Sequence, residues 1–261
     1  MSIKPIKIAI IDMYDDTSNL GMTCIVAIIN AWSKKNDIEM QYQIFPLRHK
    51  GEIPDHSFDI YLSTGGPGSP IDSVGSPWDN LYVKWLQDML SQQKPVLLIC
   101  HSFQIACRHF NFGNVCLRKS TQIGVLPVHP LVADPIFANL NDPFYTLESR
   151  LYQIIEPNDE NINKLGAKII ALEKHRPHVP LERAIMAIKF SDTMYGVQFH
   201  PEGEKNILLE FFNEEKNKKN IIDKFGAEKW EVIISKLNDD EKLPKTHAHF
   251  IPNFLNLAIG N

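Results

Sequence analysis

The residues of this sequence that could do covalent chemistry stand at the ends of predicted strands. Cys100 closes the apolar run 95–99, and a helix is predicted to begin directly after it. In an open α/β sheet the substrate crevice lies at the carboxyl ends of the strands, and a helix N-terminus favours the thiolate form of a cysteine. The placement predicts a nucleophile, although such a cysteine taken alone is more often a small core residue.

A base for this thiol is offered by the segment Gly-Val-Gln-Phe-His-Pro-Glu at residues 196–202. Here a predicted strand ends in His200, Pro201 restricts the backbone, and Glu202 follows. The carboxylate could orient the imidazole and stabilise its protonated form, as the third member of a catalytic triad does. Without a nearby nucleophile, a histidine at a strand end would be an ordinary surface residue.

A third segment, Ser-Thr-Gly-Gly-Pro-Gly-Ser-Pro at residues 63–70, follows another predicted strand. Its glycines would let a backbone N–H approach a developing oxyanion without a side chain in the way. Glycine and proline also gather in ordinary turns. Because all three segments stand at strand ends, their conjunction indicates a catalytic site more strongly than any one of them does.

Together the segments GGPGSP, PVLLICHSFQ and GVQFHPE resemble the class I glutamine amidotransferase domain, the glutaminase half of GMP synthase and its relatives. The resemblance implies a Cys-His-Glu triad, with Cys100 as nucleophile, His200 as general base and then acid, and Glu202 as the orienting carboxylate. The implied reaction is attack on the glutamine side-chain amide, formation of a γ-glutamyl thioester, release of ammonia and hydrolysis.

The same resemblance implies the remaining parts of a glutaminase site. The backbone N–H groups of Gly66 and His101 would form the oxyanion hole, and Gly68 and Gln104 would contact the substrate. The ring of His101 could supply positive charge, shape the pocket or simply face solvent. No cofactor and no metal are expected.

The sequence departs from the family at the nucleophile turn. The family pattern is Gly-x-Cys-x-Gly, whereas Leu98 and Ser102 stand at the glycine positions here. Family glycines relieve crowding where strand and helix come close, so either the turn is reshaped or different neighbours pack there. The segment 118–122 also does not match the family's other glutamine-contacting loop. These departures put glutamine specificity in question rather than the triad.

The elements that must position these residues alternate between strand and helix. Strands are predicted at 8–11, 39–45, 59–63 and 95–99, and helices at 21–32, at 78–92 and directly after Cys100. This order predicts an α/β fold with an open, mostly parallel sheet flanked by helices, flavodoxin-like, with right-handed crossovers. Short strands at 125–128, 144–147, 168–172, 184–190 and 195–199 are predicted to form an antiparallel extension. Residues 1–204 are expected to be the amidotransferase-like domain, and 205–261 a helical C-terminal extension.

Composition narrows the class of protein further. The 261 residues carry 27 Lys+Arg against 31 Asp+Glu, a formal net charge of −4, which is not the basic balance of a nucleic-acid or anionic-membrane binder. No apolar run approaches the ~20 residues of a membrane span, and the N-terminus lacks a cleavage-site pattern. The four cysteines show no paired spacing, which favours a reduced, cytoplasmic setting.

Two other stretches carry groups that could bind a ligand. Residues 173–178 read Glu-Lys-His-Arg-Pro-His, and His247 and His249 stand near the C-terminus, but neither stretch completes a recognised metal-ligand set. The first stretch, together with Glu182 and Arg183, could line a pocket for an anionic substrate, with Arg150 as a further anion contact. A surface ion-pair patch is the commoner explanation of such a sequence.

The sequence thus predicts a thiol-dependent amidohydrolase or amidotransferase that acts on glutamine or a γ-glutamyl compound. No Ser-Gly-Gly-x-Asp-Ser motif appears, and residues 205–261 are too few for an ammonia-using synthetase, so such a partner would be a separate, GMP synthase-like protein. Two alternatives stay open. One is a γ-glutamyl peptidase or hydrolase that uses the same triad, and the other is a catalytically quiet binding or regulatory module.

Overall fold

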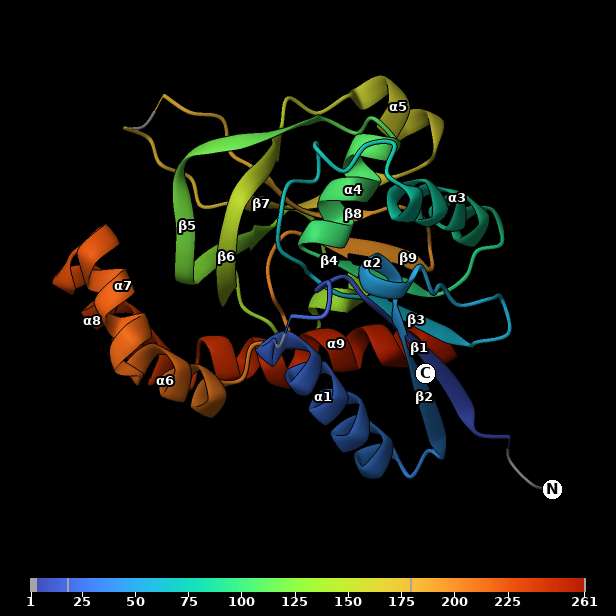
Figure 1. Ribbon diagram of the computed structural model, residues 1–261, viewed down its shortest axis with the longest axis horizontal. Coiled ribbons are helices and arrows are strands. Elements are labelled where there is room, and N and C mark those ends of the chain that lie inside the picture. Colours follow the sequence, from blue (N-terminus) through green and yellow to red (C-terminus); the bar gives the residue numbers. More distant parts are fainter. Residues whose placement is uncertain (1–3, 18, 179, 261) are drawn as a thin grey trace.

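The computed structural model describes residues 4–17, 19–178 and 180–260, and in these ranges a single nine-stranded sheet organises the chain (Figure 1). The strand order is β2-β1-β3-β4-β9-β8-β7-β5-β6. The strands are β1 (Ile6–Asp12), β2 (Met40–Pro46), β3 (Ile60–Ser63), β4 (Val96–Ile99), β5 (Asn114–Pro130), β6 (Phe144–Ile155), β7 (Lys168–Glu173), β8 (Ile185–Lys189) and β9 (Met194–Val197).

Helices cover both faces of this sheet. They are α1 (Leu20–Asn36), α2 (Leu47–Lys50), α3 (Pro77–Ser91), α4 (His101–His109), the 3₁₀ turn η1 (Pro135–Phe137), α5 (Asp159–Lys164), α6 (Lys205–Asn213), α7 (Glu215–Phe225), α8 (Ala227–Leu237) and α9 (Leu243–Ile259). Strand β1 shows why two layers are needed, because Ile8 and Ile10 pack against α1 and α9 while Ala9 and Ile11 pack on the side of α3 and α4.

The sheet confirms the predicted α/β class with a parallel core and an antiparallel extension. Strands β2, β1, β3, β4 and β9 pair in parallel, and β8, β7, β5 and β6 continue the sheet by antiparallel pairing. One prediction was wrong: β9 belongs to the parallel core beside β4 rather than to the antiparallel extension. Its sequence neighbour β8 is antiparallel to it, and a continuous apolar run does not distinguish the two directions.

The strands of the β5–β6 hairpin are longer than the sequence predicts. Their pairing runs from Asn114↔Ile155 to Val128↔Phe144, with an irregularity between Leu117 and Gln122. Polar residues interrupt this hairpin on both strands, so its apolar pattern predicts only the short ends. An irregularity of this kind bends a strand locally. Residues of the hairpin line two pockets.

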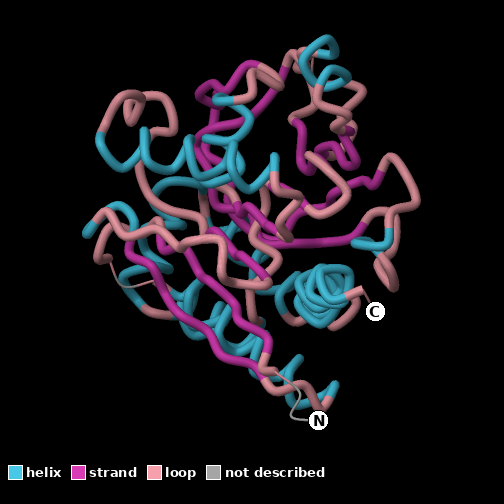
Figure 2. The backbone as a smooth tube through the Cα atoms, turned by 90° about the vertical axis from the view of Figure 1, so that its right-hand side faces the viewer, coloured by secondary structure: helices cyan, strands magenta, loops and turns pink. Residues whose placement is uncertain are grey.

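The C-terminal helices make two different contacts. Helix α9 buries Phe250, Ile251, Phe254 and Leu255 in the core beside α1, and Figure 2 shows this last helix end-on, next to the C-terminus. Helices α6–α8 form a separate apolar cluster with Val125 of β5 and stand out from the body of the protein in Figure 1.

Helices α7 and α8 divide at Gly226, whose φ of +87° favours glycine. None of the helices in the described part of the chain combines the length and hydropathy that a membrane crossing needs.

Candidate active site

Cys100 lies at a sharp turn between β4 and α4. Its φ of +49° is in a region that a residue with a side chain rarely adopts, and its backbone N–H donates to the carbonyl of Val197 on β9 at 2.7 Å. A strained strand-to-helix turn of this kind is typical of nucleophiles, because it lifts the side chain above the sheet edge. Cys100 is 6% exposed, and it lines a cavity.

The turn accommodates Leu98 and Ser102 because different neighbours provide the room. The Ser102 hydroxyl donates to the carbonyl of Thr64 at 2.6 Å and so ties α4 to the glycine loop after β3. Gly196, opposite Leu98 in the register of β4 and β9, leaves space for Phe103 of α4, whose ring would lie 2.5 Å from a Cβ at that position. The close approach of helix to sheet thus depends on a glycine in the neighbouring strand.

His200 and Glu202 lie together at the end of the chain segment that follows β9. The Nδ1 atom of His200 and the Oε1 atom of Glu202 are 2.8 Å apart, and the backbone N–H of His200 donates to the carbonyl of Leu147 on β6 at 2.9 Å. Burial alone would lower the pKa of His200, but the negative charges of Glu202 and Cys100 outweigh it and hold that pKa well above its usual value. This arrangement favours an imidazolium beside the thiol.

The glycine loop after β3 closes tightly over these groups. A Cβ on Gly65 would lie 2.8 Å from Cε1 of His200 and 3.5 Å from Cβ of Cys100, and one on Gly66 would lie 2.3 Å from the carbonyl oxygen of Met13. Arg48 holds the loop by donating to the carbonyls of Pro67 at 2.5 Å and Met13 at 3.1 Å. Side chains at these glycines would therefore displace either the imidazole or the backbone after β1.

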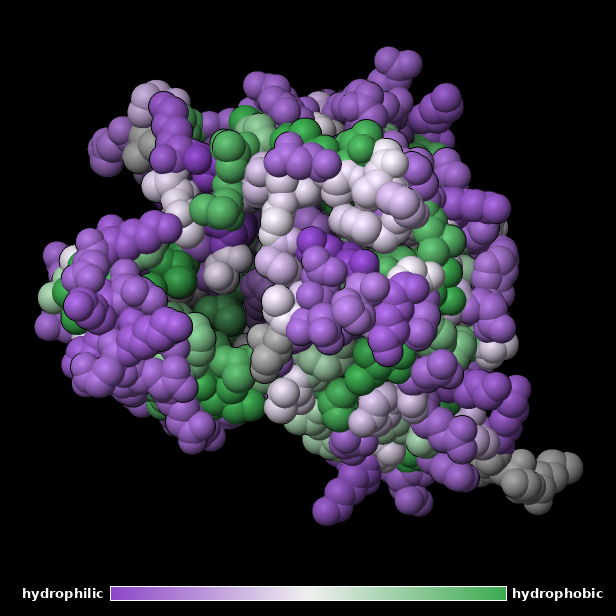
Figure 3. Space-filling view, in the orientation of Figure 1, coloured by the Kyte–Doolittle hydropathy of each residue, from purple (hydrophilic) through white to green (hydrophobic). Residues whose placement is uncertain are grey.

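A cavity of about 460 Å³ opens above Cys100 and is bounded by the loops after β1 and β3, by β5 and β6, and by α1 and α6. It is lined by Tyr14, Thr17, Asn19, Leu20, Gly21, Cys24, Gly66, Pro67, Cys100, Ile123, Leu147, Ser149, His200, Glu202, Gly203, Leu208, Phe211 and Phe212. No lysine or arginine occurs in this lining of described residues. Figure 3 shows a hollow with hydrophobic residues at its lower rim between the α6–α8 side and the body.

Two predicted substrate contacts do not reach this cavity. Gln104 is 3% exposed and donates its side-chain amide to Oε1 of Gln198 at 3.3 Å. Gly68, with φ +94°, lies beside the guanidinium of Arg48 and outside the cavity lining. The structure brings together the three proposed triad residues and Gly66, and leaves these two apart.

The ring of His101 is buried, so the solvent-facing alternative is wrong. The residue is 2% exposed, and its ring lies 6.4 Å from that of Trp78 between centroids. Burial, and then the charges of Arg48 and Arg108, lower the pKa of His101 to about 3, which leaves the ring neutral. Its side chain therefore supplies no positive charge at neutral pH, while its backbone opens α4 beside Cys100.

Two residues beside the thiol were not singled out from the sequence. The side-chain amide of Gln198 donates to Sγ of Cys100 at 3.7 Å. Tyr14 follows β1, and its hydroxyl lies against Gly21 and Gly65. Burial, and then the charges of Glu202 and Cys100, raise the pKa of Tyr14, so its phenol stays protonated. Gln198 stands inside the recognised motif, and Tyr14 directly follows a strand end, which were the available signals.

Among the described residues, no group of three or more His, Cys, Asp or Glu side chains is placed to hold a metal ion. The four cysteines are free thiols, and Cys24 shares the cavity with Cys100. Burial raises the pKa of Cys24 to about 11, so this second thiol is a poor nucleophile at neutral pH.

The fold and the strand-end arrangement agree with a match of residues 21–208 to the model of the family glutamine amidotransferase class-I. The chain belongs to this family, whose members are generally amidohydrolases or amidotransferases. A search of curated proteins found no match to the sequence.

Solved structures of similar fold extend the likeness to the whole chain. A glutamine amidotransferase from Thermotoga maritima has a TM-score of 0.72 at 15% identity, covering 99% of this chain and 100% of its own. A Thermoplasma acidophilum protein assigned to one of the subunits of GMP synthase has a TM-score of 0.54 at 18% identity, with 77% and 87% covered. The glutaminase domain of Trypanosoma brucei CTPS, solved with acivicin bound, has a TM-score of 0.56 at 14% identity, with 76% and 86% covered.

Proposed function

We propose that this protein is a thiol-dependent amidohydrolase that cleaves the side-chain amide of glutamine or of a γ-glutamyl compound. The observation that carries the proposal is the 2.8 Å contact between His200 and Glu202 beside a thiol at a strained turn. A thiolate needs an adjacent imidazolium, and the imidazole needs a carboxylate that fixes its orientation. The buried Glu202 is the carboxylate that orients the imidazole. The raised pKa of His200 favours the imidazolium beside the thiolate.

The reaction would proceed in two steps. The Cys100 thiolate attacks the amide carbon, the carbon–nitrogen bond breaks, and His200 gives its proton to the leaving ammonia, which leaves a γ-glutamyl thioester. Water then attacks the thioester, His200 accepts its proton, and glutamate leaves as the thiolate is restored. The backbone N–H groups of Gly66 and His101 would hold the oxyanion in both steps, a role that a buried, neutral His101 ring does not disturb.

We further propose that ammonia, where it is used, passes to a separate synthetase protein, as in a GMP synthase built from two chains. The similar fold of the Thermoplasma acidophilum protein supports this only at the level of architecture, given 18% identity. A cytoplasmic location suits the proposal because a thiol nucleophile must stay reduced.

A second candidate, a γ-glutamyl peptidase or hydrolase, is favoured by the chemistry of the cavity. The walls are apolar where α6 supplies Leu208, Phe211 and Phe212. Such a cavity suits a larger γ-glutamyl compound with an apolar leaving group.

Acivicin, the compound bound to the CTPS glutaminase domain, provides a direct test. Mass spectrometry of the full chain after incubation should show one label on Cys100, none in Cys100→Ala, and undiminished labelling in Cys24→Ala. Cys24 is the matched control because it lines the same cavity with a raised pKa.

Substrate assays then separate the candidates. Release of ammonia from glutamine supports the glutaminase, and turnover of γ-glutamyl dipeptides without glutamine hydrolysis supports the peptidase. Absence of labelling together with inertness toward both substrates would overturn the proposal and leave a catalytically quiet module.

A further inference from the structure

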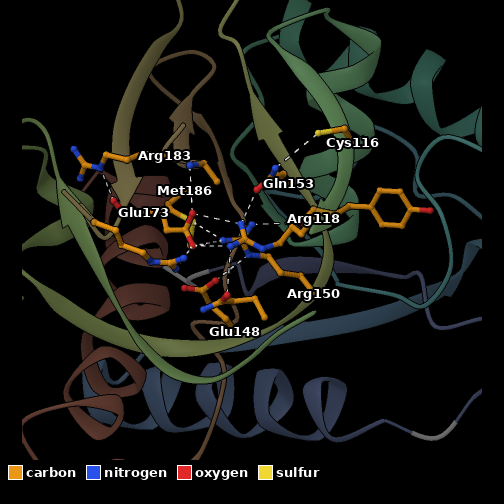
Figure 4. Close-up of polar contacts among 12 residues, drawn as sticks. Cys116, Arg118, Glu148, Arg150, Gln153, Glu173, Arg183 and Met186 are labelled. Atoms are coloured by element: carbon orange, nitrogen blue, oxygen red, sulfur yellow. Dashed lines mark hydrogen bonds and ion pairs between the residues drawn. The ribbon is translucent and has the colours of Figure 1, made fainter. Parts of the chain in front are cut away.

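A second pocket lies further along the β5–β6 hairpin from the candidate active site and shares no lining residue with it. Its volume is about 390 Å³, and it lies between the irregular stretch of β5, the end of β6 and the segment after β7 (Figure 4). The lining residues are Cys116, Leu117, Arg118, Lys119, Ser120, Gln153, Ile155, Glu173, Lys174, His175, Arg176, Pro177, Leu181, Glu182 and Arg183. It includes residues 173–177 of the basic stretch, which the proposed amidohydrolase chemistry does not use.

The lining of this pocket is positively charged, although the whole chain is negatively charged. Five cationic side chains line it, Arg118, Lys119, Lys174, Arg176 and Arg183, against the two carboxylates Glu173 and Glu182. The whole chain has a formal net charge of −4. Within the described structure, the exposed side chains of Lys119 and Lys174 make no hydrogen bond or ion pair. The pocket therefore holds a local excess of positive charge without a protein partner for it.

Arg118 places a buried cation beside the pocket that the protein satisfies only in part. Its side chain is 7% exposed, and its terminal nitrogens donate to Oε1 of Gln153 at 2.7 Å and to Oε1 of Glu173 at 2.9 Å. Its Nε has no hydrogen-bond partner among the described atoms, and a buried N–H without an acceptor is costly. Because this atom is enclosed, an oxyanion in the pocket would stabilise the guanidinium through its charge and not through Nε.

The carboxylates beneath the pocket do not balance the cations around them. Figure 4 shows Arg118 and Arg150 converging on Glu173, which also accepts from Arg176 at 2.8 Å. The only other buried acid of this group, Glu148, is paired with Arg150 at 2.8 Å, and both are 1% exposed. Burial, and then the charge of Arg150, lower the pKa of Arg118 against the opposing effect of Glu173.

We propose that this pocket binds a small metabolite through an oxyanion group, a phosphate or a carboxylate, held by Arg118 together with Lys119 and Lys174. The planar fork of an arginine and the mobile ammonium groups of two lysines are a usual combination for such groups. The site is separate from the cavity over Cys100, so it does not depend on the proposed function. It adds a binding site for an anionic compound.

Isothermal titration of the full chain with inorganic phosphate, and separately with citrate, at constant ionic strength tests the proposal. Saturable binding of phosphate alone would indicate a phosphate ester as the natural ligand, and tighter binding of citrate a carboxylate. The paired substitution Lys119→Glu with Lys174→Glu should weaken binding by about ten-fold or more, because it reverses two charges at exposed positions that the fold does not need.

The matched control is Lys216→Glu with Lys219→Glu, which makes the same charge change at exposed positions of α7 outside the pocket lining. It should leave the affinity unchanged. Arg118→Lys, which keeps the charge and removes the planar guanidinium, should weaken binding several-fold while the thermal midpoint shows that the protein is folded. No saturable binding of either probe, or equal weakening by the control, would overturn the proposal.

Discussion

The two hollows beside the β5–β6 hairpin, the cavity over Cys100 and the second pocket, differ in the charges of their lining residues. Over Cys100 the lining contains no lysine or arginine within the described residues, and the one carboxylate, Glu202, is committed to His200 at 2.8 Å. In the second pocket five cations face two carboxylates, and the buried Nε of Arg118 has no acceptor there. The first hollow pairs its one carboxylate with an imidazole, although Oε2 of Glu202 has no hydrogen-bond partner among the described atoms, whereas the second has more cations than carboxylates.

Strand β6 contributes to both hollows at different points along its length. Leu147 and Ser149 line the cavity over Cys100, and Gln153 and Ile155 line the second pocket. Side chains of a strand point alternately to its two faces, and the buried ionic pair at 148 and 150 occupies the positions between these lining residues. The contrast in charge between the two hollows therefore arises within one sheet and needs no second domain.

Removing the imidazole of His200 should give the largest loss of activity, and it should affect only the cavity over Cys100. His200→Ala leaves Cys100 without a base and is expected to lower kcat by ~10⁴-fold or more, as loss of a triad member does. Steady-state assays with the substrate that the wild type turns over measure this. Phosphate or citrate titration of the same variant should match the wild type, and a changed affinity would show that the two sites are not independent.

The sequence predicted the first hollow far better than the second. The three residues of the proposed triad stand in short motifs at strand ends, where the parallel strands β4 and β9 bring Cys100 and His200 together. The long β5–β6 pairing was not predicted because polar residues, Thr146, Glu148 and Arg150, occupy buried positions of β6 and the register of the pair is irregular. The basic stretch 173–178 was recognised as a candidate anion site, but the convergence of Arg118 and Arg150 on Glu173 depends on tertiary pairing of β5, β6 and β7.

Gln104 and Tyr14 show why local motifs stop short of a complete site. Gln104 occupies the expected position in the motif, yet its amide meets Gln198 rather than the cavity. Tyr14 lines the cavity because the loop after β1 folds over the glycine loop, a packing that no spacing along the chain encodes.

The ionic cluster under the second pocket can be broken by removing one charge. Glu148→Gln leaves Arg150 buried at 1% exposure without its main partner, and it should lower the free energy of unfolding by about 3 kcal/mol. Chemical denaturation measures the loss. The paired change Glu148→Leu with Arg150→Met removes both charges and is expected to be much less destabilising. If the single and paired changes cost the same, packing rather than charge holds the cluster together.

A single methyl group, introduced by Gly65→Ala, should disturb the cavity over Cys100 and leave the second pocket unchanged. The new Cβ would lie 2.8 Å from Cε1 of His200, so the ring must move, and kcat should fall by roughly 10²-fold, the effect of a misplacement of about 1 Å. Anion binding at the second pocket should not change. Adding Gly65→Ala to His200→Ala should cause no further loss of activity, and an additional loss would show that the methyl group acts elsewhere.

The smallest effect is a shift in the titration of His200. Its pKa is held above the usual value chiefly by Glu202 and Cys100, against the opposing effect of burial, so Glu202→Gln should lower that pKa. In NMR titrations of labelled imidazoles, the His200 signal of the variant should titrate at lower pH than that of the wild type. The control Glu231→Gln, at an exposed position on α8, should leave the signal unchanged.

The same titration has a consequence for stability whose sign follows from linkage. Because the folded-state pKa of His200 lies above its unfolded value of ~6.5, the protonated ring stabilises the fold fully below that value. This stabilisation is lost as the pH rises through the folded-state pKa. Thermal midpoints of the wild type should therefore fall over that window relative to those of Glu202→Gln. Parallel curves for the two proteins would mean that Glu202 orients the imidazole without holding its proton.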